Sequence, residues 1–332
     1  MLPPISAPSA TVSPALSLGI DIGGTKVAAG VVDEHGAIVE ELRRDTPGRD
    51  PRAVEAVITE LVQELGTRHQ LGSVGIGAAG WMDLAGSRVV FSPHLAWRDE
   101  PLQENLQGLL GRPVLVTNDA DAAAWAEWRF GAGRDRDRMV MLTLGTGIGG
   151  ALVLDGRVER GSFGMAGEFG HQIIMPGGHR CECGNRGCWE QYASGNALGR
   201  EGRELARKHS PMAAGLLAAA GGRPKGITGQ VVTALALQGE HTAQELVAEV
   251  GEWLGLGIAN LAAALDPALF IIGGGLSAAG DLLLEPARRA YLRNLTGRGY
   301  RQEAIIAEAQ LGPMAGLIGA ADLAREQSQK KS

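Results

Sequence analysis

The sequence predicts an α/β protein whose two halves repeat one structural plan. Residues 18–36 read LGIDIGGTKVAAGVVDEHG, and residues 140–156 read VMLTLGTGIGGALVLDG. Each stretch is an apolar run, a Gly/Thr turn, a second apolar run and an acidic turn that ends in Gly, which is typical of strands joined by tight turns. Because such a repeat constrains the whole fold, we predict two facing units, each a β-meander followed by helices.

The first half is expected to begin near Leu16, and residues 1–15 are expected to form a disordered tail. That tail is rich in Pro, Ser and Ala and has no Lys or Arg, so it lacks the features of a signal peptide. We predict helices after Pro51 and over residues 102–110 and 120–130. Strands are predicted over residues 18–22, 27–32, 37–42, 74–78 and 114–117.

The second half repeats the pattern and then becomes mostly helical. Strands are predicted over residues 139–144, 149–154 and 268–272. Thr242 and Glu245 are spaced as a capping box, which predicts a long helix from Thr242 towards Leu265. A last helix is predicted over residues 316–325.

Composition narrows the class of protein. The 332 residues carry a net charge of −6 and are 45 % hydrophobic, which is an ordinary globular balance without the basic face of a nucleic-acid binder. The longest apolar region, residues 253–276, is interrupted by Asn260, Asp266 and Pro267, so we expect no membrane span and a cytoplasmic location.

The first Gly/Thr turn is a candidate phosphate loop. Its glycines allow a close backbone approach, its hydroxyl and amides can bind phosphate oxygens, and Asp21 could orient a hydrated Mg²⁺. The alternative is a plain hairpin turn that happens to carry an acid. The residues of this motif are Asp21, Gly23, Gly24, Thr25 and Lys26.

The second turn, Gly145, Thr146 and Gly147, belongs to a G-x-G-x-x-G match that ends at Gly150. A dinucleotide fingerprint needs a helix after the glycines, but residues 151–154 look like a strand, so a second phosphate-binding turn is the better interpretation. Further along, Gly273, Gly274 and Gly275 follow a predicted strand. They form either a flexible loop or a close backbone passage beneath a flat ligand such as adenine.

Asn118 and Asp119 lie at the carboxyl end of a predicted strand. There they could be N-caps of the following helix, or Asp119 could be a catalytic base, since α/β proteins place chemistry at such strand ends. Asp121 competes as the acid, but it falls in the first helical turn, where the helix dipole favours it structurally.

All three cysteines, Cys181, Cys183 and Cys188, fall within eight residues. Such clustering suits metal ligation in a reducing compartment better than a disulfide framework. With one histidine they would close a tetrahedral zinc site, and spacing alone leaves His171 and His179 as rival fourth ligands.

Taken together, these motifs resemble the ROK family of sugar kinases and related repressors, within the actin-like ATPase superfamily. The resemblance runs from Leu18 to about Ala324. Its most specific part is Glu168-x-Gly-His171 followed by Cys-x-Cys-Gly-x-x-Gly-Cys-x-Glu190. It implies a duplicated two-domain fold with a zinc-binding insert over residues 168–192. It also implies a small domain of residues 16–118 joined by the C-terminal helix 314–328, and a large domain of residues 119–313.

The resemblance also implies roles and partners. Asp119 matches the base that takes the proton from a sugar 6-hydroxyl, and His171 matches the zinc ligand. The two Gly/Thr turns and Gly273–Gly275 match the phosphate and adenosine contacts. The implied ligands are ATP, Mg²⁺, a structural Zn²⁺ and glucose, bound to a homodimer or homotetramer. Sugar contacts are implied for Gly80, Asn118, Asp119, Glu168, His171 and Glu190.

The sequence departs from the family pattern at two positions, and several activities other than glucose phosphorylation remain as alternatives. His94 and Asp121 stand where relatives often carry Asn. The rival activities are phosphorylation of mannose or an N-acetylhexosamine and use of polyphosphate as donor. A DNA-binding repressor is disfavoured because only twenty residues precede Asp21.

Overall fold

The computed structural model describes residues 16–47, 50–92 and 95–331, with side chains described up to residue 330. The predicted tail at residues 1–15 and the departure at His94 lie outside the described residues.

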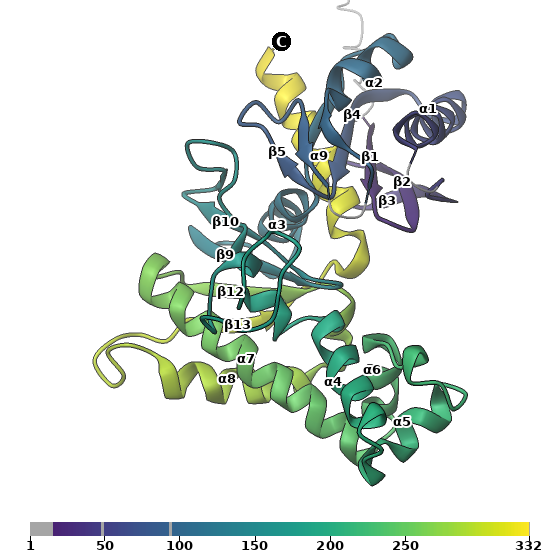
Figure 1. Ribbon diagram of the computed structural model, residues 1–332. Coiled ribbons are helices and arrows are strands. Elements are labelled where there is room, and N and C mark those ends of the chain that lie inside the picture. The colour runs from purple at the N-terminus through teal and green to yellow at the C-terminus, as the bar shows by residue number, and fades with distance from the viewer. Residues whose placement is uncertain (1–15, 48–49, 93–94, 332) are drawn as a thin grey trace, which may run out of the picture.

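Two five-stranded sheets share one strand plan (Figure 1). The first has the order β3 (Ile38–Asp45), β2 (Lys26–Val32), β1 (Leu16–Ile22), β4 (Leu71–Ala78) and β8 (Leu115–Asn118). The second has the order β11 (Arg157–Glu159), β10 (Ile148–Leu154), β9 (Arg138–Leu144), β12 (Leu269–Gly273) and β13 (Ile305–Glu308). In both sheets the first three strands pair antiparallel and the rest parallel, so the predicted duplication is confirmed.

Helices bury the outer face of each sheet. On the first sheet lie α1 (Pro51–Arg68) and α2 (Leu102–Leu110). Beside them is a small three-stranded sheet that the sequence did not predict, formed by β5 (Trp81–Met82), β6 (Val89–Phe91) and β7 (Arg98–Glu100). On the second lie α7 (His241–Leu265) and α8 (Asp281–Asn294). A lobe of α4 (Gly195–Arg207), α5 (Ala214–Ala219) and α6 (Gly229–Leu237) projects beyond them (Figure 1).

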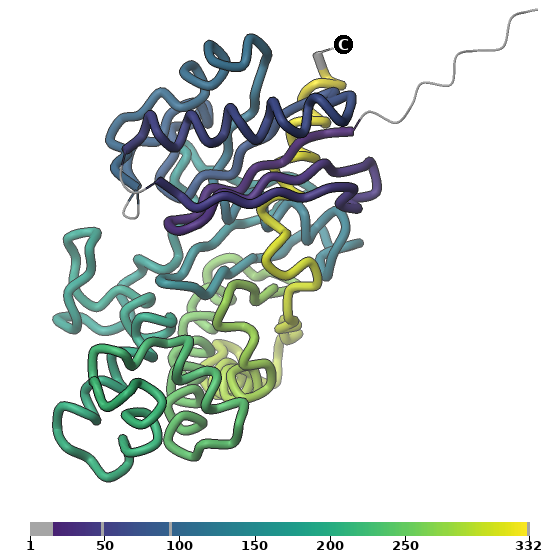
Figure 2. Tube along the Cα trace, turned by 90° about the vertical axis from the view of Figure 1, so that its right-hand side faces the viewer, coloured from purple at the N-terminus to yellow at the C-terminus, as the bar shows by residue number. Residues whose placement is uncertain are grey.

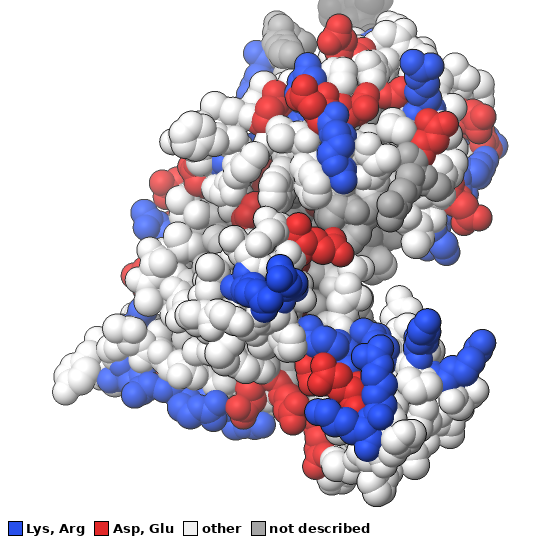
Figure 3. Space-filling model, viewed as in Figure 1, with Lys and Arg blue, Asp and Glu red and all other residues white. Residues whose placement is uncertain are grey.

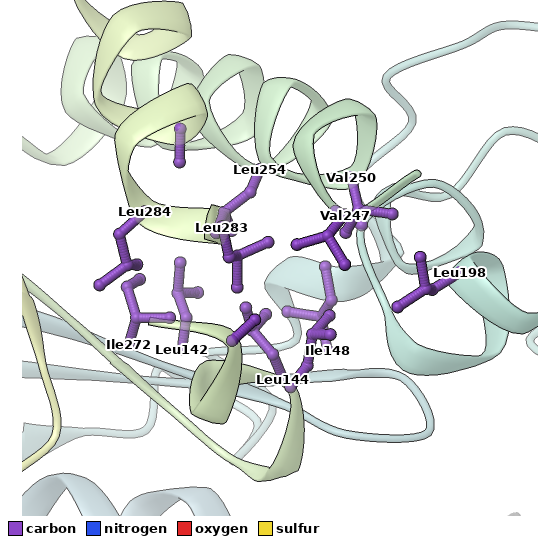
Figure 4. Packing of buried hydrophobic residues seen from close by; sticks show 14 of the residues in the cluster. Leu142, Leu144, Ile148, Leu198, Val247, Val250, Leu254, Ile272, Leu283 and Leu284 are labelled. Carbon is purple, nitrogen blue, oxygen red and sulfur yellow. The ribbon is translucent and has the colours of Figure 1, made fainter. Parts of the chain in front are cut away.

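The larger core fills the space between the second sheet and its helices. Leu142, Leu144 and Ile272 of the strands point towards Leu254 of α7 and Leu283 of α8, as Figure 4 shows. All five side chains are fully buried. The close packing of these branched side chains fixes the strand edge on which the site is built.

The start of α7 differs from the prediction. The helix begins at His241, and its N-cap is Glu240, whose carboxylate accepts a hydrogen bond of 2.6 Å from the backbone N–H of Ala243. Thr242 is buried in the first turn instead, so the predicted capping box is wrong. By length and composition α7 could span a membrane, but 61 % of its most apolar window is buried within the protein, which is typical of a core helix.

Helices α3 (Asp119–Phe130) and α9 (Ala315–Lys331) pack on each other between the two sheets. Figure 2 shows the final segment, drawn yellow, running from the half with the second sheet into the half with the first. Residues of α3, α9, β9 and β10 form one apolar cluster. The chain therefore passes between the sheets through residues 119–137 and again through residues 309–314.

The contact of α9 with the first sheet depends on two paired glycines, Gly19 of β1 and Gly75 of β4. A Cβ at Gly75 would lie 1.8 Å from the carbonyl oxygen of Ala320, and one at Gly19 would lie 1.9 Å from that of Leu317. We expect Gly75→Ala to lower the free energy of unfolding by about 3 kcal/mol, because it forces the helix off the sheet. Urea unfolding measures this.

The matched control is Gly108→Ala in α2, where a Cβ would meet no atom within 4 Å. We expect it to stabilise the protein by up to about 1 kcal/mol through helix propensity alone. Equal stabilities for the two variants would show that α9 does not rest on the sheet as described.

Candidate functional site

The carboxyl ends of strands from both sheets meet at one cleft. A cavity of about 340 Å³ lies there. Turns and strand ends supply its predicted residues, which are Gly23, Gly24, Gly80, Asn118, Asp119, Gly145, Thr146, Gly147, Glu168, His171, Glu190 and Gly274. A cavity at the switch between strands is where α/β folds bind ligands. In Figure 3 the molecule is hollowed between its upper half and the lobe of α4, α5 and α6, and on this face cationic and anionic side chains are interspersed.

A second cavity of about 440 Å³ adjoins the first. Asp119, Ala120, Thr143 and Gly274 line both of them. The second cavity is also lined by Asp21, Gly275, Ser277, Glu308, Gly312 and Gly316. Asp119 thus lies at the boundary between two adjoining chambers, where a group could pass from a molecule in one to a molecule in the other.

Of the two interpretations of this motif, the N-cap role applies to Asn118, and the cavity-facing position applies to Asp119. Asn118 is the N-cap of α3, and its side-chain oxygen accepts hydrogen bonds from the N–H groups of Ala120 and Asp121 at 2.8 and 3.1 Å. Its amide donates to the carbonyl of Gly80 at 3.0 Å, which fixes the turn after β4. Asp119 is the first residue of the helix and faces the cavities.

Several partly buried carboxyl groups surround this boundary. Burial, and then the charge of Asp119, raise the pKa of Asp21 to about 7. Burial also raises the pKa of Glu168 to about 7, with Asp119 and Glu190 adding to the rise against a hydrogen bond from Trp81. Clustered carboxylates of this kind repel one another, and a divalent cation with its phosphate ligands would restore their ionised form.

Asp121 has a structural partner that the sequence did not reveal. Its carboxylate lies 3.4 Å from Nε of Arg160, whose Nη2 also donates to the carbonyl of Asp83 at 3.3 Å. Burial raises the pKa of Asp121 to about 7, and Arg160 opposes that rise. Arg160 therefore ties the segment that leads to Glu168 to α3 and to the loop after β5.

The metal-binding set forms as the cysteine clustering predicts. The side-chain ligand atoms of His171, Cys181, Cys183 and Cys188 all lie within 4.8 Å of one another. The Sγ atoms of Cys183 and Cys188 are 3.5 Å apart, close to the roughly 3.8 Å expected between two sulfur ligands of tetrahedral zinc. The donor set and its spacing fit a zinc ion.

Of the two candidate histidines, only His171 lies with the cysteines in the ligand set. Nδ1 of His171 lies 3.5 Å from Sγ of Cys181, while its Nε2 faces Glu168 at 3.9 Å. His179 instead packs against the ring of Tyr192, with centroids 5.3 Å apart, and is not in the ligand set. His171 thus presents one nitrogen to the cysteines and the other to the cavity.

Some predicted residues lie beside the cavities rather than in their walls. Thr25 and Lys26 hold the first turn, where the carbonyl of Lys26 accepts from Gly23 N–H at 2.9 Å and that of Thr25 from Thr46 N–H at 2.9 Å. Gly273 packs against Met141.

Conversely, the cavities contain residues that no motif marked. Among them are Trp81, Ser277, Glu308, Gly312 and Gly316. The repeat could have pointed to two cavity residues. Thr143 lies near the end of the predicted strand β9, and Glu308 ends β13, which takes the same place in the second sheet as β8 in the first.

Comparisons with known proteins agree with this geometry. The profile of the ROK family matches residues 17–327. The chain is 47 % identical over 311 residues to a glucokinase of Streptomyces coelicolor, covering 94 % of this chain and 98 % of that protein. It is 36 % identical over 320 residues to an N-acetylmannosamine kinase of Citrobacter koseri, covering 93 % and 98 %.

A solved structure extends this likeness to three dimensions. The ROK family glucokinase of Streptomyces griseus, in complex with glucose and AMPPNP, aligns with a TM-score of 0.87 at 45 % identity. The alignment covers 94 % of this chain and 100 % of that one.

Proposed function

This chain belongs to the ROK family, and we propose that it transfers the terminal phosphoryl group of ATP to the 6-hydroxyl of glucose. The observation that carries the proposal is the position of Asp119 at the boundary of two adjoining cavities. Its support from relatives is the glucokinase of Streptomyces griseus, which binds glucose and an ATP analogue in a closely similar fold.

The first cavity would hold the sugar. Asp119 would accept the proton of the 6-hydroxyl as that oxygen attacks phosphorus, and the other polar groups would fix the ring for in-line attack. Their mixture of carboxylates, amide and imidazole suits the alternating hydroxyl groups of a hexose. The groups assigned to the sugar are Gly80, Asn118, Glu168, His171 and Glu190.

The second cavity would hold the nucleotide. Its phosphates would reach the two turns that pair by the internal repeat, where backbone N–H groups can bind their oxygens. Mg²⁺, held near Asp21, would neutralise charge on the donor phosphates. The residues assigned to ATP are Asp21, Gly23, Gly24, Thr25, Lys26, Gly145, Thr146, Gly147, Gly273, Gly274 and Gly275.

We further propose that zinc at His171 and the three cysteines has a structural role. The short segment Phe169–His171 carries the histidine, and the segment Trp189–Gln191 carries Glu190. Sγ of Cys181 lies 3.0 Å from Oε1 of Glu190. A metal at this point would hold both sugar-facing segments in one position.

A substrate panel tests the activity. Steady-state rates are measured with glucose, mannose, fructose, N-acetylglucosamine and N-acetylmannosamine, each with ATP and with polyphosphate. We expect the highest kcat/KM for glucose with ATP. A higher value for N-acetylmannosamine would favour the second candidate, which the Citrobacter koseri relative supports.

Domain organisation, location and assembly are also proposals. The shared strand plan supports a small domain of residues 16–118 with helix 314–328 and a large domain of residues 119–313. Use of ATP and three free thiols support a cytoplasmic location. A homodimer or homotetramer is proposed from the family resemblance alone, and light scattering tests it.

A further inference from the structure

Glu127 is a fully buried carboxylate that the proposed reaction does not use. It lies near the end of α3, about two helical turns beyond Asp119. Burying an ionised side chain is costly unless its oxygens accept hydrogen bonds, so the partners of Glu127 indicate what the residue is for.

Its partners come from both places where the chain passes between the two sheets. Oε2 accepts a hydrogen bond of 2.9 Å from the N–H of Ala132, in residues 131–137, the part of the first crossover that follows α3. Oε1 accepts one of 2.7 Å from the N–H of Leu311, in the second crossover at residues 309–314. A single carboxylate therefore joins two segments that lie far apart in the sequence.

The backbone around Glu127 strengthens the first of these attachments. Its carbonyl oxygen accepts from the N–H groups of Gly131 and Gly133 at 3.0 and 2.9 Å. A Cβ at Gly131 would lie 2.0 Å from Oε2, so only glycine leaves room for the carboxylate to reach Ala132.

The second attachment leads to the nucleotide cavity. Leu311 stands between Ala309 and Gly312, and both of these residues line the cavity that we assign to ATP. The chain connects the two sheets only through residues 119–137 and 309–314 among the described residues, so a rotation of one sheet relative to the other is taken up within these two crossovers.

We propose that Glu127 is a positioning residue that joins the two crossovers into one hinge, so that closure around sugar and nucleotide is a single rotation. The proposal rests on the proposed function for the ligands that drive closure. It assigns no part in the chemistry to Glu127, which reaches the reacting groups only through the backbone.

Glu127→Gln tests the proposal, since it keeps the size of the side chain but turns one acceptor into a donor that faces a backbone N–H. We expect amide hydrogen exchange to rise about ten-fold in both crossovers. We expect kcat to fall about ten-fold while the Kd for glucose, measured by tryptophan fluorescence, changes less than about three-fold.

The matched control is Glu240→Gln, which weakens a carboxylate–amide bond at the start of α7, outside both crossovers. Its exchange should rise only near Ala243, and its kcat should stay unchanged. Faster exchange in Glu127→Gln confined to residues 131–137, or an unchanged kcat in the folded variant, would overturn the proposal.

The wild-type protein provides a second test should the variant not fold. With glucose and AMPPNP, exchange at residues 131–137 and 309–314 should slow together. Slowing in one crossover alone would contradict a common hinge. Wild-type turnover of glucose is measured separately, so failure of the proposed activity would be distinguished from failure of the hinge.

Discussion

Asp119→Asn is expected to lower kcat for glucose phosphorylation by about 10³-fold. General base catalysis contributes roughly 10²- to 10⁴-fold, and an amide cannot take the proton of the 6-hydroxyl at neutral pH. The fold should persist because asparagine keeps the side-chain oxygen that accepts the 3.0 Å hydrogen bond from Ala120 N–H. Glucose affinity should change little, since the remaining sugar-facing groups are intact.

The measurement combines a coupled assay of ADP release with glucose binding followed by tryptophan fluorescence, for which Trp81 in the cavity wall is a natural reporter. Asp121→Asn is the matched control. It removes a carboxylate two residues away that pairs with Arg160 instead of facing the cavities, so its kcat should stay within about ten-fold of wild type. Turnover of Asp119→Asn as fast as that of the control would disprove the assignment of the base.

The sequence predicted the fold well where local patterns repeat. The paired turns at Gly23 and Gly145 predicted the duplication, and the two sheets have the same strand order. The rejection of a dinucleotide fingerprint at Gly145–Gly150 is likewise confirmed, because β10 begins at Ile148, inside the motif, and a strand stands where the fingerprint needs a helix.

The sequence could not predict contacts made by segments that are distant along the chain. Arg160 has no motif around it, and its role emerges only where it meets Asp121 and Asp83. In the sequence Glu127 is an ordinary helix residue, and its role becomes visible only in the fold, where its carboxylate accepts a hydrogen bond from the N–H of Leu311. The start of α7 was misplaced for a local reason, since Glu is a weaker N-cap than Thr by propensity but Glu240 reaches Ala243 in the fold.

The choice between His171 and His179 shows the same limit more sharply. Both histidines are near the cysteines in sequence, and His179 is the nearer. A ligand must also lie on the correct side of the metal, and only the three-dimensional path of the loop decides that. The chain brings Nδ1 of His171 to Cys181 and turns His179 towards Tyr192.

Removal of zinc is expected to weaken glucose binding by about 10²-fold, and not only to lower stability. His171 and the three cysteines connect the segments that present Glu168 and Glu190 to the cavity, and losing two hydrogen bonds of about 1.5 kcal/mol each would cost that much. Protein treated with a chelator, and Cys188→Ser, which loses a fully buried ligand, should behave alike. Zinc content, glucose affinity and thermal unfolding are measured on the same samples.

Asn185→Ser is the control for this prediction, because Asn185 is exposed between two ligands, is not in the ligand set and lines neither cavity. It should keep its zinc and its glucose affinity. Readdition of zinc to the chelated protein should restore binding, whereas Cys188→Ser should recover little. The two consequences of a metal site can therefore be separated: a loss of unfolding temperature with normal glucose affinity would mean that zinc stabilises the loop without positioning the sugar contacts. A joint loss would mean that the cysteine cluster also positions the sugar contacts His171 and Glu190.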